Sequence, residues 1–303
     1  AGSSYAPLVA QFNDQQLAAV QCDGNLLIVA PPGSGKTGTL VGKAMRILRT
    51  DAARVGMVTF TRAAAAEMRT RVLAKRGQGQ GQRVVAETFH RHALAQLRSL
   101  RIAPRLLEPR ESKDLVISAM AQAGSCMPLE DAIAEIETQK ALLTFNCRAD
   151  GCESELVQAY QEMLRSRRAV DLMDVIRLAV EGMRSGRFPP LKVTHLLCDE
   201  MQDADAWQLE WCMTHAEAGA VTTLVGDDDQ SLYSFRHALG YAGMIAFRDR
   251  CQANQVNLSI NYRSRQEILL AGLAAVILVY WKQRHLPLCP VHVVTVRLAV
   301  CKC

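Results

Sequence analysis

Residues 25–37 read Asn25-Leu-Leu-Ile-Val29-Ala-Pro-Pro-Gly-Ser-Gly-Lys-Thr37, and the fold can be inferred from them. The apolar run at 25–29 is typical of a short buried strand, and helical periodicity begins at Thr37 and continues toward Thr50. A strand, a glycine-rich loop and a helix in this order can wrap backbone N–H groups around a polyphosphate. We expect Lys36 to reach the β- and γ-phosphates and the Thr37 hydroxyl to hold Mg²⁺. The expected nucleotide-binding residues of the loop are Gly33, Ser34, Gly35, Lys36 and Thr37.

A second apolar run, Val193 to Cys198, ends at two adjacent carboxylates, Asp199 and Glu200. Side chains alternate along a strand, so the two carboxylates point in different directions. An adjacent acid pair alone is usually a solvated turn, but a phosphate-binding loop elsewhere in the chain favours hydrolysis. We therefore assign Asp199 to Mg²⁺ and Glu200 to positioning and deprotonating a water molecule.

The segment 226–236, GDDDQSLYSFR, follows a third strand pattern. Carboxylates and Gln230 at the end of a strand suit a site for metal and phosphate. Two aromatic rings with an arginine suit stacked bases and a phosphate backbone. The segment therefore predicts a place where nucleotide chemistry meets nucleic acid, with Tyr233, Phe235 and Arg236 on the nucleic-acid side.

Four more short motifs accompany these three in a fixed order. They are Phe12-Asn-Asp-Gln-Gln16, Val58-Thr-Phe-Thr-Arg62, Thr88-Phe-His90 and Asn261-Tyr-Arg-Ser264. Together the seven motifs resemble those of the UvrD/Rep/PcrA-like superfamily 1 DNA helicases, over about residues 12 to 270. The chain departs from that pattern at Met201, where relatives carry an aromatic residue, and at Gly38, where many carry arginine.

The resemblance implies an ATP-dependent 3′–5′ DNA helicase or translocase that uses ATP and Mg²⁺ and moves on single-stranded and partly duplex DNA. It implies that Gln16 reads the adenine edge, Tyr262 packs on the adenine and Arg263 approaches the γ-phosphate. Gln230 would sense that phosphate and relay its loss to the DNA. The implied DNA contacts are Phe60, Thr61, Arg62, Thr88, His90, Tyr233, Phe235 and Arg236, whereas we expect Phe89 in the core.

The order of patterns along the chain predicts an α/β fold. We expect a P-loop NTPase domain with a RecA-like parallel sheet and helices on both faces, formed by residues 1–95 and 189–264. Helical periodicity dominates residues 96–188, which predicts an inserted all-helical subdomain. The carboxylates of Asp171 and Asp174 resemble a family element, but a helix N-terminal turn also explains them and is the interpretation we prefer.

The amino-acid composition is compatible with the predicted nucleotide- and DNA-binding protein. The 303 residues carry a net charge of +5, which permits a polyanionic partner without requiring one. The ten cysteines match no zinc framework, so we expect reduced thiols and a cytoplasmic protein. About 14 apolar residues at 268–281 are too few for a membrane span, which needs roughly 20.

The end of the chain departs from the family. About 39 residues follow Ser264, too few for the second RecA-like domain found in relatives. We expect residues 265–303 to be a short apolar tail, non-native after about residue 275, from a truncated or frame-shifted gene. The alternative function is therefore a remnant that binds ATP and DNA without unwinding. A P-loop kinase is a weaker alternative, because the Gln16 motif and the Tyr-x-Phe-Arg cluster would not serve it.

Overall fold

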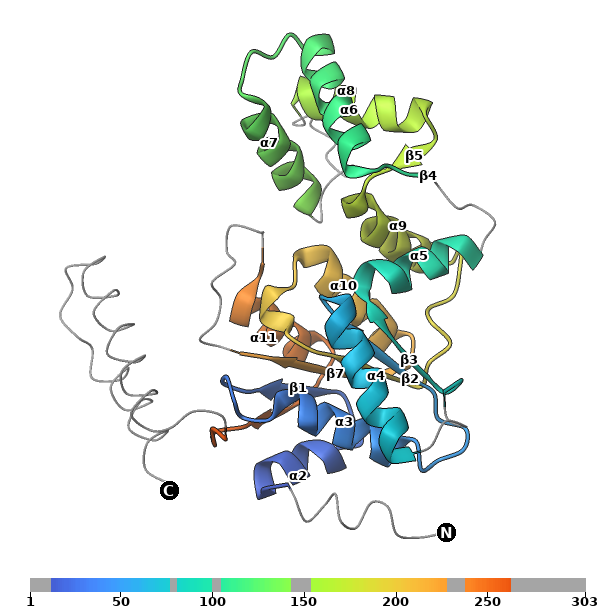
Figure 1. The fold of residues 1–303 in the computed structure, drawn as a ribbon, viewed down its shortest axis with the longest axis vertical. Coiled ribbons are helices and arrows are strands. Elements are labelled where there is room, and N and C mark those ends of the chain that lie inside the picture. Colours follow the sequence, from blue (N-terminus) through green and yellow to red (C-terminus); the bar gives the residue numbers. More distant parts are fainter. Residues whose placement is uncertain (1–11, 77–80, 100–104, 143–153, 228–237, 263–303) are drawn as a thin grey trace, which may run out of the picture.

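The structure, a computed structural model, describes residues 12–76, 81–99, 105–142, 154–227 and 238–262 (Figure 1). Six parallel strands form one sheet in the order β3-β2-β6-β7-β1-β8. The strands expected at 25–29, at 193–198 and directly before the segment 226–236 are present, each within two residues of its expected position, and the predicted parallel α/β sheet is confirmed. The strands are β1 (Leu26–Val29), β2 (Val55–Thr59), β3 (Val84–Thr88), β6 (His195–Cys198), β7 (Val221–Gly226) and β8 (Asn254–Asn257).

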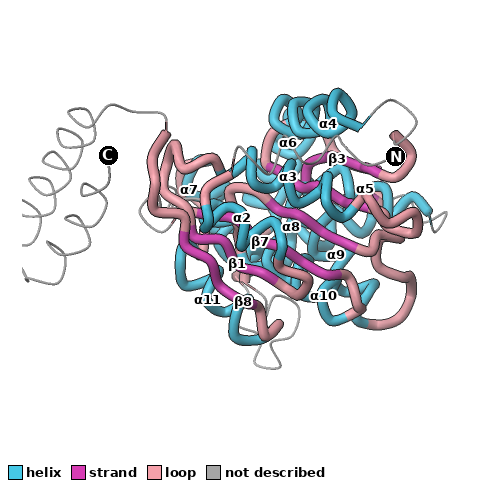
Figure 2. The backbone as a smooth tube through the Cα atoms, turned by 90° about the horizontal axis from the view of Figure 1, so that it is seen from below, coloured by secondary structure: helices cyan, strands magenta, loops and turns pink. Residues whose placement is uncertain are grey.

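Helices cover both faces of this sheet, and Figure 2 shows the strands running between them. Alternate residues of β1 face opposite ways: Leu26 and Ile28 belong to one core cluster, Leu27 and Val29 to the other. Burial on both sides explains why the strands read as nearly continuous apolar runs. The first cluster includes α2 (Asp14–Gln21), α3 (Lys36–Ile47) and α4 (Arg62–Arg76); the second includes α5 (Phe89–Ser99), α9 (Leu172–Arg184), α10 (Ala206–Glu217) and α11 (Gly240–Arg250).

Three further helices form a separate unit with its own apolar core, which we call the helical unit. They are α6 (Pro109–Gln122), α7 (Leu129–Ala141) and α8 (Glu155–Ser166), drawn in green in Figure 1. Two short strands that the sequence did not predict, β4 (Arg105–Leu106) and β5 (Ala169–Val170), pair beside it. Helix α9 lies within the predicted helical segment 96–188 but packs against the sheet core. Among the helices of the described ranges, none combines the length and apolar content needed to cross a bilayer.

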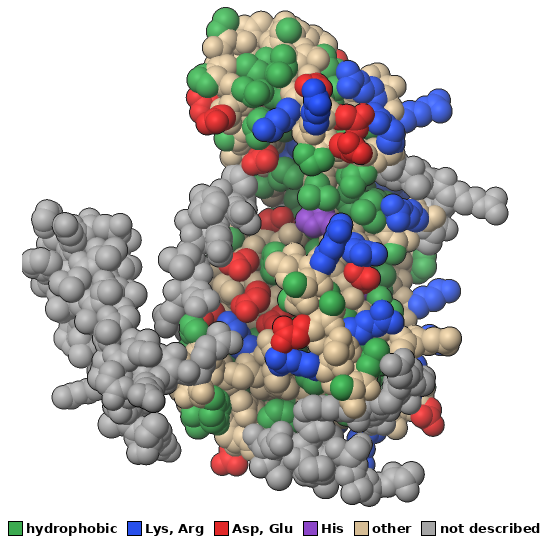
Figure 3. All heavy atoms as spheres, in the orientation of Figure 1, with side chains coloured by type: hydrophobic (Ala, Val, Ile, Leu, Met, Phe, Trp, Pro, Cys, Tyr) green, Lys and Arg blue, Asp and Glu red, His purple; other side chains and the backbone are tan. Residues whose placement is uncertain are grey.

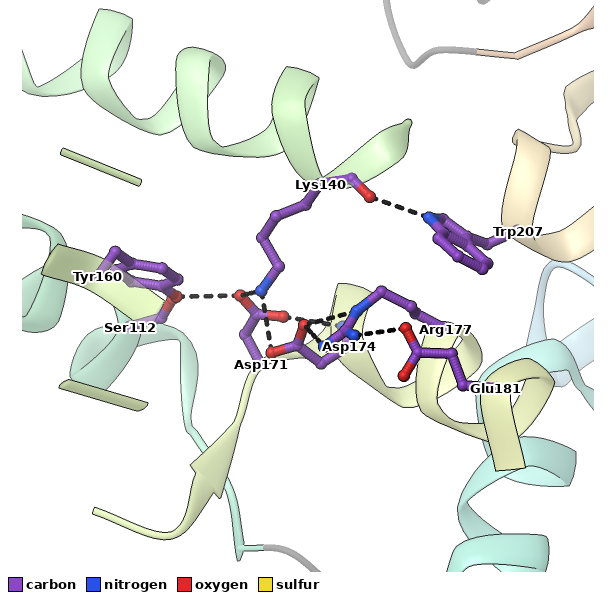
Figure 4. A network of polar contacts seen from close by, with 8 residues as sticks. All are labelled: Ser112, Lys140, Tyr160, Asp171, Asp174, Arg177, Glu181 and Trp207. Atoms are coloured by element: carbon purple, nitrogen blue, oxygen red, sulfur yellow. Dashed lines mark hydrogen bonds and ion pairs between the residues drawn. The ribbon is translucent and has the colours of Figure 1, made fainter. Parts of the chain in front are cut away.

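The helical unit is joined to the sheet domain through a buried charge cluster (Figure 4). Asp171 is the N-cap of α9 and accepts a hydrogen bond from the Asp174 N–H, which confirms the preferred N-terminal-turn interpretation. The sequence did not reveal their common partner. Lys140, at the end of α7 and only 1% exposed, places Nζ 2.5 Å from Asp171 Oδ2 and 2.9 Å from Asp174 Oδ2.

Hydrogen bonds extend this cluster into the neighbouring helices. Tyr160 on α8 donates to Asp171 at 3.0 Å, and Trp207 on α10 donates its indole N–H to the Lys140 carbonyl at 2.9 Å. Burial opposes the charged form of Asp174, but Lys140 and Arg177 outweigh it and lower the pKa of that carboxyl. The surface shows hydrophobic side chains gathered where the helical unit meets the sheet domain (Figure 3). Paired charges therefore fix a junction that is otherwise largely apolar.

Removing the lysine should leave two buried carboxylates without their cation. We predict that Lys140→Ala lowers the free energy of unfolding by about 3–5 kcal/mol, measured by urea denaturation at pH 7. The deficit should narrow as the pH falls, because the unpaired carboxylates can then take up protons.

Arg105→Ala is the control, because it breaks a half-exposed ion pair with Glu111 on the helical unit. It should lower the free energy of unfolding by no more than about 1 kcal/mol. Equal effects of the two substitutions would contradict a special role for the buried cluster.

Candidate active site

The phosphate-binding loop joins β1 to α3 and depends on two glycines. Gly33 has a φ of 76° and Gly35 a φ of 84°, in the left-handed region that side chains rarely allow. A Cβ on Gly35 would also lie 2.7 Å from Nε2 of Gln16. Gly35 is the N-cap of α3 and has no side chain to occupy the first N–H groups of the helix. Those groups can therefore bind an anion.

The acidic pair follows β6 and meets this loop at the carboxyl edge of the sheet. The Thr37 hydroxyl donates to Asp199 Oδ2 at 3.1 Å, and Lys36 Nζ donates to Glu200 Oε2 at 3.1 Å. Glu200 has a left-handed backbone, with φ 57° and ψ 38°, a conformation that is uncommon without glycine and is concentrated at functional sites. The structure thus brings together the four side chains that the sequence assigned to phosphate, metal and water.

The environment of Asp199 is suited to a cation. Its side chain is buried; this burial, followed by the charge of Glu200, raises the pKa of the Asp199 carboxyl to about 6. The carboxylate and the Thr37 hydroxyl are oxygen ligands of the kind Mg²⁺ prefers. A group of three or more acidic, histidine or cysteine ligands does not occur in the described ranges. Mg²⁺ needs no such cage, because substrate phosphates and water complete its shell.

Two residues predicted to contact adenine lie beside the loop. The buried Gln16 amide accepts from the Asn13 N–H at 3.2 Å and donates to the Ser34 carbonyl at 2.9 Å. Tyr262 donates its N–H to the Gly33 carbonyl at 2.8 Å, and its hydroxyl accepts from Asn13 Nδ2 at 2.7 Å. The Tyr262 side chain remains exposed and available for stacking. Gln16 supports the loop directly, while its reading of adenine stays a prediction.

Several predicted DNA contacts follow β2 and β3 at the same edge. Thr59 and Thr88 are paired in the sheet, so the residues after them leave neighbouring strands side by side. Phe60 is half-buried with its ring 5.4 Å from that of Phe89, which is in the core as expected. Thr61 and Arg62 are exposed, and Thr88 and His90 are half-buried. A cavity of about 130 Å³ lies between the acidic pair and the predicted DNA contacts after β2. Its lining includes Thr37, Asp199, Glu200, Phe60, Thr61 and Glu67.

Residues 12–242 match the UvrD/REP helicase N-terminal domain. The chain belongs to the UvrD/REP helicase family. DNA helicase II of Escherichia coli is 30% identical over 295 residues, ATP-dependent DNA helicase UvrD1 of Mycobacterium tuberculosis 29% over 301, and ATP-dependent DNA helicase PcrA of Leuconostoc citreum 30% over 304. The aligned regions cover 89%, 86% and 88% of the chain but only 41%, 38% and 39% of these relatives. The chain thus spans about two fifths of the length of these helicases.

Some predicted residues of this UvrD/REP family site lie outside the described residues. They are Gln230, Tyr233, Phe235, Arg236 and Arg263, together with the tail 265–303. Their roles remain predictions.

Other residues at the edge were not singled out from the sequence. Asp227, fully buried after β7, places Oδ2 3.9 Å from Lys36 Nζ. Gln202 contacts Glu200, and Asn261 donates to the Pro32 carbonyl at 2.7 Å. Asp227 and Asn261 lie inside two of the seven motifs, and Gln202 follows the acidic pair by two residues. The sequence therefore places all three in or beside a motif but does not predict their individual contacts.

The raised pKa of Asp199 leads to a prediction about stability without metal. A carboxyl whose pKa rises on folding favours the folded state at low pH, and this contribution is lost as the pH rises through about 6. Asp199→Asn should therefore stabilise the chain at pH 8 in EDTA by up to roughly 3 kcal/mol, with the gain vanishing near pH 4.

Urea denaturation at the two pH values measures this effect. Asp23→Asn, at an exposed carboxylate paired with Arg46, is the control and should give no gain at pH 8. If Asp199→Asn changed the free energy of unfolding equally at both pH values, the charge of Asp199 would not be the cause of the destabilisation.

Proposed function

We propose that this chain binds ATP with Mg²⁺ at the carboxyl edge of its sheet and hydrolyses it while bound to single-stranded DNA. The activity proposed for the complete protein is that of a cytoplasmic 3′–5′ DNA helicase or translocase acting on single-stranded and partly duplex DNA. The observation that supports it most is the paired approach of Thr37 to Asp199 and of Lys36 to Glu200, each at 3.1 Å. Names such as DNA helicase II and ATP-dependent DNA helicase PcrA, carried by its relatives, support the same activity.

Each side chain has a distinct proposed part in hydrolysis. Asp199 and Thr37 would hold Mg²⁺, which neutralises phosphate charge when bound. Lys36 would exchange the Glu200 carboxylate for the phosphates, which frees Glu200 to orient a water molecule and take its proton. The predicted role of Arg263 is to neutralise negative charge that develops on the transferring phosphoryl group.

The cavity beside the acidic pair supports coupling to DNA. Phe60 and Thr61 line the same cavity as Thr37 and Asp199, so a nucleotide-dependent shift at the metal site can reach the base-contacting residues directly. Stacking of bases on an aromatic ring tolerates any sequence, as a translocase requires.

The first test is ATP hydrolysis with and without a single-stranded oligonucleotide. We expect DNA to stimulate turnover and Glu200→Gln to reduce it about 100-fold or more, because the water loses its base. Binding of a fluorescent ATP analogue should be retained in Glu200→Gln and weakened in Lys36→Ala. Unchanged turnover in Glu200→Gln would remove Glu200 from the role of base. Nucleotide binding without DNA-stimulated turnover would favour the remnant that binds without unwinding.

The second test separates stacking from phosphate contact. Phe60→Leu keeps apolar packing but removes the ring, so single-stranded DNA should bind more weakly by about 1–3 kcal/mol with an unchanged salt dependence. Arg62→Ala should weaken binding and make log Kd less dependent on log salt concentration, by a slope of about 0.7. Fluorescence anisotropy over a salt series measures both. The same slope change in both variants would contradict a stacking role for Phe60.

A further inference from the structure

Gln202 uses both ends of its side-chain amide at the active site. It lies in the short 3₁₀ helix Met201–Asp203 after β6 and is 2% exposed. Its Nε2 donates to Glu200 Oε2 at 2.9 Å, and its Oε1 accepts from the Asp227 N–H at 3.0 Å. One buried side chain thus connects the proposed base to the residue that follows β7.

The neighbouring backbone leaves room for this bridge. Strands β6 and β7 are adjacent in the sheet, with Cys198 paired to Leu224. A Cβ on Gly226, the last residue of β7, would lie 3.1 Å from Gln202 Oε1, 3.1 Å from the Gln202 backbone nitrogen and 2.3 Å from Met244 Sδ. A glycine at the end of β7 therefore allows the amide to approach the Asp227 N–H.

Glu200 depends on side-chain partners for its orientation. Its side chain is 44% exposed, and its carboxylate extends from a left-handed backbone rather than from a regular element. In the described ranges, the side chains bonded to Glu200 Oε2 are Lys36 and Gln202. Under the proposed function Lys36 leaves for the phosphates, and Gln202 then remains to hold the carboxylate.

We infer that Gln202 is a positioning residue for ATP hydrolysis, an inference that rests on the proposed function. Its amide donor keeps the Glu200 carboxylate oriented when Lys36 turns to the nucleotide. Its acceptor ties that orientation to Asp227, where the chain leaves β7. An amide is required, because a carboxylate cannot donate to Glu200 and an apolar side chain can do neither.

The decisive substitution is Gln202→Glu. It keeps the shape of the side chain and the acceptor for the Asp227 N–H, but it removes the donor and places a second negative charge beside Glu200. We expect kcat of DNA-stimulated hydrolysis to fall at least about 10-fold while the KM for ATP changes less than about 2-fold, because the lost interaction acts on the base rather than on nucleotide binding.

Gln208→Glu is the matched control. Gln208 accepts from the Asp205 N–H in the capping box of α10, a position where glutamate serves equally well. The control adds the same charge in the first turn of α10, the helix that follows the 3₁₀ helix in the chain, and should leave kcat unchanged. Wild-type kcat in Gln202→Glu, or an equal loss in Gln208→Glu, would overturn the inference.

A second measurement does not depend on turnover. In nitrogen-15-labelled protein, the Gln202 side-chain amide signals are identified by their absence in Gln202→Met. We expect them to shift and to exchange faster with water in Glu200→Ala, and to remain protected when wild-type protein binds Mg²⁺ with a non-hydrolysable ATP analogue. Signals unmoved by Glu200→Ala, or lost protection with the analogue, would overturn the inference. If the wild-type chain shows no hydrolysis, the proposed function fails for this chain, whereas the amide signals still decide whether Gln202 holds Glu200.

Discussion

The ammonium group of Lys36 lies between carboxylates delivered by two neighbouring strands, 3.1 Å from Glu200 after β6 and 3.9 Å from Asp227 after β7. The Asp227 carboxylate is fully buried, whereas Glu200 is partly exposed. A buried carboxylate is costly without a cation, so this lysine supplies part of the charge balance before any nucleotide binds. Asp199 accepts hydrogen bonds from the Thr37 hydroxyl and the Glu200 N–H rather than from an ammonium, and its burial, followed by the charge of Glu200, raises its pKa to about 6. Under the proposed function, Mg²⁺ would neutralise Asp199, and Lys36 would leave Glu200 for the phosphates.

The parallel sheet makes this arrangement possible. Because all six strands run the same way, the loop after β1 and the acidic residues after β6 and β7 must emerge at one edge. The same edge carries Phe60 after β2 and Thr88 at the end of β3. From the acidic pair the chain continues through Gln202 into α10, where Trp207 bonds to Lys140 of the helical unit. The acidic motif is thus connected to the sheet, to β7 and to the helical unit over a few residues.

Much of this could be predicted because the signals are local. Apolar runs predicted the strands, and the order of glycine, lysine and threonine predicted the phosphate-binding loop. The carboxylate of Asp171 predicted the N-terminal turn of a helix. The contacts that escaped prediction join residues far apart in the chain. Lys140 meets Asp171 across 31 residues, and Gln202 meets the Asp227 N–H across 25. Neither periodicity nor spacing encodes such pairs, because each depends on how complete helices and strands pack. Gln16 illustrates the same limit. The family resemblance implies that it contacts adenine, but only the structure shows that its amide donates to the Ser34 carbonyl.

We propose that the charges at this edge are arranged so that Lys36 exchanges the Glu200 carboxylate for phosphate when ATP binds. A crystal structure of the chain with Mg²⁺ and a non-hydrolysable ATP analogue tests it most directly. We expect Lys36 to leave Glu200 for the phosphates, Mg²⁺ to lie between Thr37 and Asp199, and the Gln202 amide to keep its bond to Glu200. A bound analogue with Lys36 still paired to Glu200, or with its phosphates away from the loop at 30–37, would contradict it.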